Sequence, residues 1–172
     1  MLNDIQKHIL EIVADMAGGK AEGAVNIRAN GQRAYHSDSP HIKIVSKTDK
    51  EGIDVFIEPG TKGETVHIPV VLSLDGLKDR VYNDFYVGEG ADVTIVAGCG
   101  IHSCGDCDSE HDGIHTFYVG KNARVSYQEK HYGEGEGKGK RILNPQTILY
   151  LEEGASVTLD SSQIRGVDDT KR

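Results

Sequence analysis

The chain has 172 residues, 37% of them hydrophobic and 21 of them glycine, which predicts one domain, 1–172, with many turns around a modest core. With 27 acidic against 19 basic residues, the net charge of −8 argues against a nucleic-acid-binding surface and against binding to anionic membranes. No apolar run approaches the length that spans a bilayer. We therefore expect a protein, a metal ion or a small molecule as the partner.

The first element is predicted to be a helix within residues 1–18. Its apolar residues recur at alternating steps of three and four, so they lie on one face of the helix: Leu2, Ile5, Ile9, Ile12 and Met16. Asn3 is the predicted N-cap, Gln6 lies three positions on, and Gly18-Gly19 ends the helix. This apolar face is expected to pack on the end of a sheet or on a second subunit.

From residue 24 onward the pattern changes to short β-type runs separated by turn residues, at 42–45, 53–57 and 66–72. An internal repeat follows at equal intervals: YVGEGADVTIV begins at Tyr86, YVGKNARVSYQ at Tyr118 and YLEEGASVTLD at Tyr150. A fixed period of this kind indicates stacked coils. The sequence therefore predicts a mainly β fold, with a β-solenoid over 24–172 after the N-terminal helix.

Matching positions of the repeat carry matching residues. Alternate residues of a strand point the same way, so five columns are expected to stack as the interior: Phe85, Phe117 and Leu149; Val87, Val119 and Leu151; Ala91, Ala123 and Ala155; Val93, Val125 and Val157; Ile95, Tyr127 and Leu159. Gly90, Asn122 and Gly154 precede the alanines and tolerate the positive φ of a tight corner.

All three cysteines lie within nine positions, and three histidines are interleaved with them or follow them; the set is Cys99, Cys104, Cys107, His102, His111 and His115. The segment 98–108 is rich in glycine and polar residues, so we expect a loop whose thiolates converge on one ion or cluster. Redox or disulfide use, or thiols without any ligand, are the alternatives. Three cysteines cannot all pair, and no secretory signal precedes them, so a reducing, cytoplasmic location is expected.

A second glycine-rich stretch, GEGEGKGK, lies one repeat after the cysteine segment and is expected to be a flexible loop tip. It lacks the Gly-Lys-Ser or Gly-Lys-Thr ending of a phosphate-binding loop. His131 precedes this tip and is predicted to be a surface residue at a strand end, because no carboxylate partner or nucleophile is recognisably spaced with it.

The segments ARVSYQEKHYGEG, RILNPQTILYLEEGASV and QIRGVDDTKR resemble the β-helical core of the SufB/SufD family of iron–sulfur cluster assembly proteins, over about 81–172. The resemblance is strongest in ILNP and in the EEGA corner rather than in any catalytic signature. It implies a right-handed parallel β-helix that acts as a scaffold for cluster assembly with a SufC-type ATPase subunit as partner. Family members continue beyond the position of Arg172 with more coils and the ATPase-docking segment, so we expect a fragment or a truncated relative without that docking segment.

These observations together predict a non-enzymatic scaffold or accessory component of iron–sulfur cluster assembly, with a transient iron–sulfur cluster or iron as its cofactor. The alternative is a zinc-binding or redox-responsive protein-interaction module in which the cysteine loop is structural. A solenoid hydrolase is disfavoured, because no set of carboxylates stands out on one face. Unpaired strands at the last coil predict a homo-oligomer, pairing with a SufB/SufD-like protomer, or a capped end, and the N-terminal helix is one candidate cap.

Overall fold

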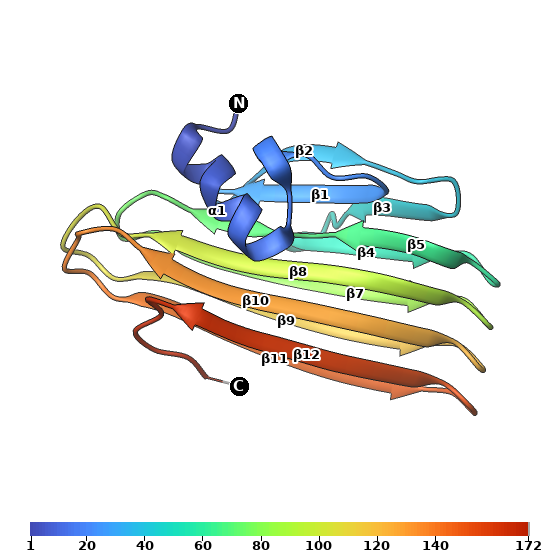
Figure 1. Cartoon of the computed structure of the whole chain (residues 1–172). Helices are drawn as coiled ribbons and strands as arrows, with labels where there is room; N and C mark the ends of the chain where they lie inside the picture. The colour runs from blue at the N-terminus through green and yellow to red at the C-terminus, as the bar shows by residue number, and fades with distance from the viewer. Residues whose placement is uncertain (172) are drawn as a thin grey trace.

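The computed structural model describes residues 1–171, which form a β-solenoid with one short N-terminal helix (Figure 1). The fold class expected from the sequence is confirmed. The elements in chain order are α1 (Asp4–Ala14), a 3-10 turn (Ala17–Gly19), β1 (Ala24–Ala29), β2 (Gln32–Ser37), β3 (Ile42–Ser46), β4 (Gly52–Ile57), β5 (Lys62–His67), β6 (Val70–Leu72), β7 (Lys78–Val87), β8 (Asp92–His102), β9 (Ser109–Val119), β10 (Arg124–Glu134), β11 (Arg141–Leu151) and β12 (Ser156–Arg165).

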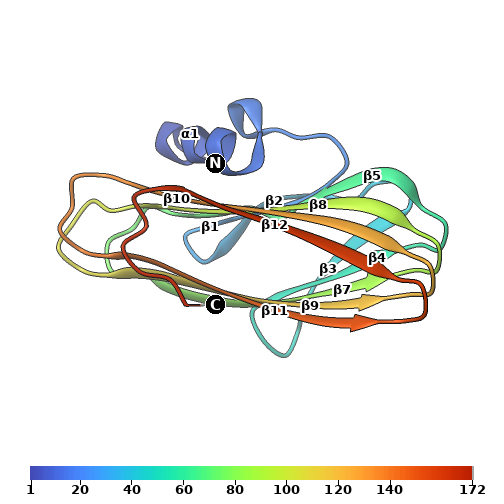
Figure 2. The same cartoon turned by 60° about the horizontal axis from the view of Figure 1, so that its bottom comes forward.

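Two sheets face each other and form the walls of the solenoid (Figures 1 and 2). Sheet A has the strand order β12-β10-β8-β5-β1-β2, with β6 beside β1 and β8, and sheet B has the order β11-β9-β7-β4-β3. Each regular coil contributes one strand to each sheet, and strands of successive coils pair in parallel. Val93 pairs with Val125, which pairs with Val157, so one repeat of the sequence is one coil of the solenoid.

The corners of the coils require residues that accept a left-handed backbone. Gly90, Asn122 and Gly154 have φ values of 67°, 57° and 73°, as the repeat predicted. A Cβ at Gly154 would lie 2.2 Å from Oδ1 of Asn122, so a side chain there would clash with the corner above it. The corner residue is therefore limited both by its own backbone and by the coil on which it stacks.

The expected columns form an apolar core along one half of the interior. The rings of Phe85 and Phe117 stack with their centroids 4.5 Å apart, and both side chains are fully buried. A large apolar side chain contributes about 1.5–3 kcal/mol when it is buried in this way. Three column members of the last coil are exposed, because no later strand within residues 1–171 covers them: Leu149 is 37% exposed, Leu151 47% and Leu159 49%. Ala155 and Val157 are half-buried against the core.

The helix α1 lies on the outer face of sheet A, where it covers β8 and β10 (Figure 2). Asn3 and Gln6 form the capping box that the sequence predicted, but the helix ends at Ala14, earlier than expected, because Asp15 turns into the left-handed region. Gly98 makes the close approach possible, since a Cβ there would lie 2.0 Å from the carbonyl oxygen of Val13. The helix thus covers a sheet face and does not cap the last coil.

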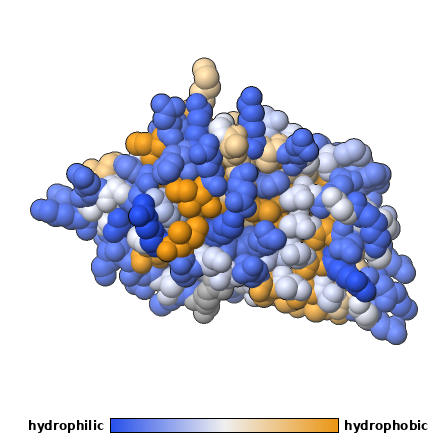
Figure 3. Space-filling view, viewed as in Figure 1, coloured by the Kyte–Doolittle hydropathy of each residue, from blue (hydrophilic) through white to orange (hydrophobic). Residues whose placement is uncertain are grey.

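The two ends of the solenoid differ. At the N-terminal end, the antiparallel hairpins β1–β2 and β3–β4 make β2 the outermost strand of sheet A and β3 that of sheet B. At the C-terminal end, β11 and β12 are the outermost strands, and within residues 1–171 only the tail after β12 begins to cover them, through a bridge between Ile142 and Asp169. Figure 3 shows apolar surface along this lower edge. This end presents unpaired backbone groups beside exposed apolar side chains.

No helix within residues 1–171 combines the length and the apolar character that crossing a bilayer requires.

Replacing Val125 by Asp tests the stacked interior. Val125 is 2% exposed between Val93 and Val157, so a carboxylate there would be buried without a partner and is expected to cost at least about 3 kcal/mol. Ser126→Asp is the matched control, because Ser126 is the next residue along β10 and points to the opposite face. Thermal unfolding followed by circular dichroism should show loss of the folded state for the first variant alone. A stably folded Val125→Asp protein would contradict this account of the core.

Candidate functional site

The other half of the solenoid interior is polar. Alternation along β8, β9 and β10 turns five chemically active side chains into the space between the sheets, and we call this set the polar interior: Cys99, His111, His115, Glu129 and His131. All five side chains are at least nine-tenths buried. Buried groups of this kind need partners, and the partners come mostly from neighbouring coils.

Asp79 on β7 links the polar interior to the N-terminal hairpins. Its carboxylate accepts three hydrogen bonds from the guanidinium of Arg28, two from Nε at 3.2 Å to Oδ1 and 3.0 Å to Oδ2, and one from Nη2 to Oδ1 at 2.7 Å. Oδ2 of Asp79 also accepts a hydrogen bond from Nδ1 of His111, at a distance of 3.1 Å. Burial alone would raise the pKa of Asp79, but the hydrogen bonds from His111 and Arg28 hold it well below its usual range. Asp79 is therefore an ionised carboxylate that fixes the orientation of His111.

Two of the buried imidazoles keep a nitrogen without a hydrogen-bond partner within residues 1–171, namely Nε2 of His111 and Nδ1 of His115. Both rings lie over Gly113, where a Cβ would come within 2.7 Å of Nε2 of His115. Burial lowers the pKa of His115 to about 4, so this ring is neutral at pH 7. A neutral imidazole offers a lone pair, which is the form that binds a metal ion.

Glu129 and His131 on β10 are held by the next coil. Ser161 donates to Oε2 of Glu129 at 2.9 Å, and Nε2 of Gln163 donates to Nδ1 of His131 at 2.6 Å. The proton of His131 is then on Nε2, 3.6 Å from Oε1 of Glu129. Burial raises the pKa of Glu129, but the hydrogen bond from His131 and the other contacts outweigh this and lower it to about 2. The pair is an ionised carboxylate facing an N–H group.

Cys99 is the only one of the three cysteines that reaches this interior. Its thiol is 7% exposed, and burial, together with the charges of Glu129 and Asp79, raises its pKa far above the usual range. The space between the five side chains is about 10 Å³, roughly the minimum for one water molecule. Within residues 1–171, no three His, Cys, Asp or Glu side chains are arranged to hold a metal ion. The five side chains of the polar interior therefore lie close together, but no three of them surround a common point where an ion could sit.

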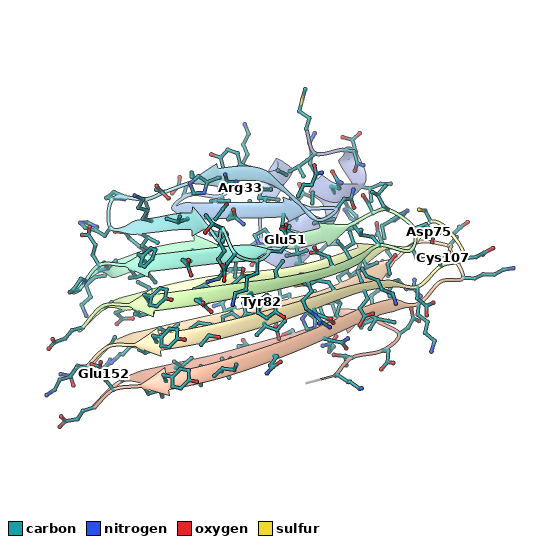
Figure 4. All side chains as sticks on the ribbon, turned by 180° about the vertical axis from the view of Figure 1, so that it is seen from behind. Arg33, Glu51, Asp75, Tyr82, Cys107 and Glu152 are labelled. Atoms are coloured by element: carbon teal, nitrogen blue, oxygen red, sulfur yellow. The ribbon has the colours of Figure 1, made fainter. Side chains whose placement is uncertain are left out.

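The other predicted site residues lie elsewhere. Cys104 and Cys107 are exposed in the loop between β8 and β9, and Figure 4 shows Cys107 beside Asp75 at one end of the molecule. Asp75 raises the pKa of Cys107 and accepts its backbone N–H at 3.2 Å. His102 is the last residue of β8, and its Nδ1 lies 3.1 Å from Oε1 of Glu134. The structure thus distributes the six predicted residues over three places, and it brings Cys99, His111 and His115 together.

Two expectations about the site were wrong. The segment 98–108 was expected to be a loop, but β8 continues to His102, which makes Cys99 an interior residue. His131 was expected at the surface, but it is 1% exposed. The signal for His131 was in the repeat itself, because it lies one repeat after Cys99 and pairs with it between β10 and β8. Arg28 and Asp79 were missed, since no local spacing marks them. Glu129 was also missed, although it lies two positions before His131 on β10 and therefore points the same way.

Comparison with known proteins gives one informative similarity. The chain is 30% identical over 111 residues to an "Iron-sulfur cluster assembly SufBD family protein" from Archaeoglobus fulgidus. The match covers 63% of this chain and 28% of that protein, so the chain spans much less than two thirds of the relative's length. No family model matches the chain, and no solved structure matches it. The similarity suggests the family that the sequence segments resemble.

The ion pair of Asp79 predicts a pH-dependent contribution to stability. Because the pKa of Asp79 is lower in the folded than in the unfolded protein, its ionised form stabilises the fold above about pH 4, and this contribution is lost as the pH falls further. Asp79→Asn should therefore cost about 3 kcal/mol at pH 7 and progressively less towards pH 2, measured by urea unfolding. Asp160→Asn, at an exposed position of β12, is the control and should cost little at either pH. An Asp79→Asn cost that does not change with pH would contradict the ion-pair assignment.

Proposed function

We propose that this chain acts as a non-enzymatic component of iron–sulfur cluster assembly, in which the polar interior handles iron or a nascent cluster as transient cargo. The observation that carries the proposal is the set of thiol, imidazole and carboxylate groups in the polar interior. Sulfur and imidazole nitrogen are the donors that iron centres use in proteins. The similarity to the Archaeoglobus fulgidus protein supports the same role.

The two unpartnered imidazole nitrogens strengthen the proposal. Leaving a buried polar atom without a hydrogen bond costs about 1–3 kcal/mol, so folded proteins rarely keep such atoms without a functional reason. Here they belong to His111 and His115. Asp79 accepts a hydrogen bond from Nδ1 of His111, the ring nitrogen other than the unpartnered Nε2, and carboxylates commonly orient histidine ligands in this way. Loading of an ion would require the coils to separate locally, because the present space is about 10 Å³.

A second candidate function rests on the exposed loop. Cys104 and Cys107 are accessible and three residues apart, which suits a zinc-binding or redox-responsive interaction module. Asp75, Asp106 and Asp108 raise the pKa of Cys107 and so reduce its thiolate fraction. Burial has the same effect on Cys99, so the pKa of the thiols does not separate the two candidates. The two candidates place the metal in different parts of the molecule and are separable by substitution.

Reconstitution with iron and sulfide under anaerobic conditions distinguishes them. If the polar interior is the site, Cys99→Ser and His115→Gln should each lower the iron content by more than half, and the double variant Cys104→Ser, Cys107→Ser should retain it. Elemental analysis gives the metal content, and circular dichroism checks that each variant is folded. Zinc uptake that depends on Cys104 and Cys107 alone would support the second candidate. Iron content unchanged by Cys99→Ser and His115→Gln would rule out the polar interior.

We also propose that the open C-terminal end pairs with a second solenoid, either another copy of this chain or a SufB/SufD-like protomer. The exposed apolar residues at this end support it, and they come from both outer strands: Leu149, Tyr150 and Leu151 on β11, and Leu159 and Ile164 on β12. Unpaired edge strands beside apolar side chains favour pairing with another chain. The same end adjoins His131, whose partner Gln163 lies on β12.

Light scattering tests this assembly. The wild-type chain should be dimeric or larger at high concentration, and Leu149→Lys combined with Leu159→Lys should shift it to monomer, because the charges would be desolvated in the contact. Leu74→Lys is the matched control, since Leu74 is 54% exposed in the connection between β6 and β7. A wild-type chain that stays monomeric both alone and with a SufB/SufD-like protomer would contradict the proposed pairing.

A further inference from the structure

A separate pocket of about 360 Å³ opens at the N-terminal end of the solenoid, between the hairpins β1–β2 and β3–β4. Figure 4 labels two of its lining residues, Arg33 and Glu51, and the nearby Tyr82. Arg33 comes from β2, and Glu51 lies in the turn before β4. The pocket is in the lower part of the size range of small-molecule sites. None of the five residues of the polar interior lines it.

Four cationic side chains line this pocket, and they are of two kinds. Arg28 is bonded to Asp79 and Glu51, and Lys47 lies 2.7 Å from Asp84, so carboxylates already neutralise both. Arg33 and Lys50 have no carboxylate partner within residues 1–171. The pocket therefore has two cationic groups available to an anionic group of a ligand.

Lys50 is held in place by an aromatic ring. Its Nζ lies 4.7 Å from the ring centroid of Tyr82, a cation–π contact that leaves its N–H groups able to donate elsewhere. Arg33 is exposed in the neighbouring hairpin. Both groups line the same pocket, so a carboxylate bound there would have a cation from each hairpin.

The pocket also offers hydrogen-bond acceptors. Asn26 is 7% exposed, and its Oδ1 is buried without a hydrogen-bond partner within the described chain. A buried acceptor of this kind is costly unless a ligand or water supplies a donor. Glu51 adds a carboxylate, 70% exposed, which is bonded through Oε2 to Nη1 of Arg28 at 3.1 Å. These oxygens suit an ammonium group.

The remaining wall is aliphatic. The side chains of Ile53, Ile68, Val70 and Val81 line the pocket, and all four are at most 5% exposed. Val70 comes from sheet A, Ile53 and Val81 come from sheet B, and Ile68 lies between β5 and β6, so the apolar wall extends into the space between the sheets. Such a wall favours a short branched hydrocarbon group over a charged one.

We propose that this pocket binds a free amino acid with an aliphatic side chain. Arg33 and Lys50 receive its carboxylate, Asn26 and Glu51 receive its ammonium group, and the aliphatic wall receives its side chain. The cationic, acceptor and apolar groups of the pocket together match the zwitterion, whereas a simple anion would leave Oδ1 of Asn26 without a donor. This inference is independent of the function proposed for the polar interior.

Calorimetric titration of the whole chain with L-leucine and three analogues tests the proposal. Each analogue lacks one group: 4-methylpentanoate has no ammonium group, 3-methylbutylamine has no carboxylate, and glycine has no side chain. We expect L-leucine to bind with a dissociation constant below about 1 mM and each analogue to bind at least about tenfold more weakly. Absence of leucine binding, or an analogue that binds as tightly as leucine, overturns the proposal.

Substitutions locate the binding. Arg33→Gln and Lys50→Gln should each weaken leucine binding but leave that of 3-methylbutylamine unchanged, because only the carboxylate contact is removed. Lys43→Gln is the matched control, since Lys43 is an exposed lysine of β3 outside the pocket. Cys99→Ser should not change leucine binding, which separates this site from the polar interior. Leucine binding that is unaffected by both Arg33→Gln and Lys50→Gln overturns the proposal, and thermal unfolding confirms that each variant is folded.

Discussion

The structure depends on one constraint, the in-register parallel stacking of coils of equal length. Every strand from β7 onward pairs with the strand one coil away, and a slip by one residue would turn each interior side chain outward. The same register stacks identical or similar residues outside as well as inside. On the outer face of sheet B, four rings form a ladder with centroids 5.1 Å apart: Phe56, Tyr86, Tyr118 and Tyr150. Each stacked pair adds about 0.5–1.5 kcal/mol beyond its burial.

The same stacking explains how the interior carries charge. Asp79 lies one coil from His111, and Glu129 lies one coil from Ser161, so each buried carboxylate is satisfied by a residue one repeat away. A carboxylate in this environment without such a partner would be protonated rather than ionised. The polar interior is therefore fixed by the coils on both sides of it. These contacts fix the buried side chains in place, and the space left between them is about 10 Å³.

The outermost strands of the two sheets differ between the two ends of the solenoid. The antiparallel hairpins β1–β2 and β3–β4 end the two sheets at the N-terminal end, and they contribute Arg33 and Lys50 to the pocket there. The helix α1 covers the side of sheet A over Gly98, where the missing side chain lets the helix backbone approach. At the other end, the exposed column residues make pairing with a further β-structure favourable. The candidate sites thus lie inside and at the ends of the solenoid.

The repeat, the corners and the apolar columns could be assigned from the order of the amino acids alone. These features follow from local alternation and from a fixed period, and both are visible along the chain: Val93, Val125 and Val157 could be assigned to one column without coordinates. The residues Cys99, His111 and His115 could also be named, because their types and density were unusual.

Which of the reactive groups meet depends on how the coils stack and not on spacing along the chain. Cys99 and Cys104 are close in the sequence, yet one is buried and the other exposed, because β8 ends between them. Conversely, Arg28 and Asp79 are 51 positions apart and form a buried ion pair. Closeness in sequence did not predict these contacts, because hydrogen bonds between coils join residues about one repeat apart, and the irregular N-terminal hairpins follow no repeat at all.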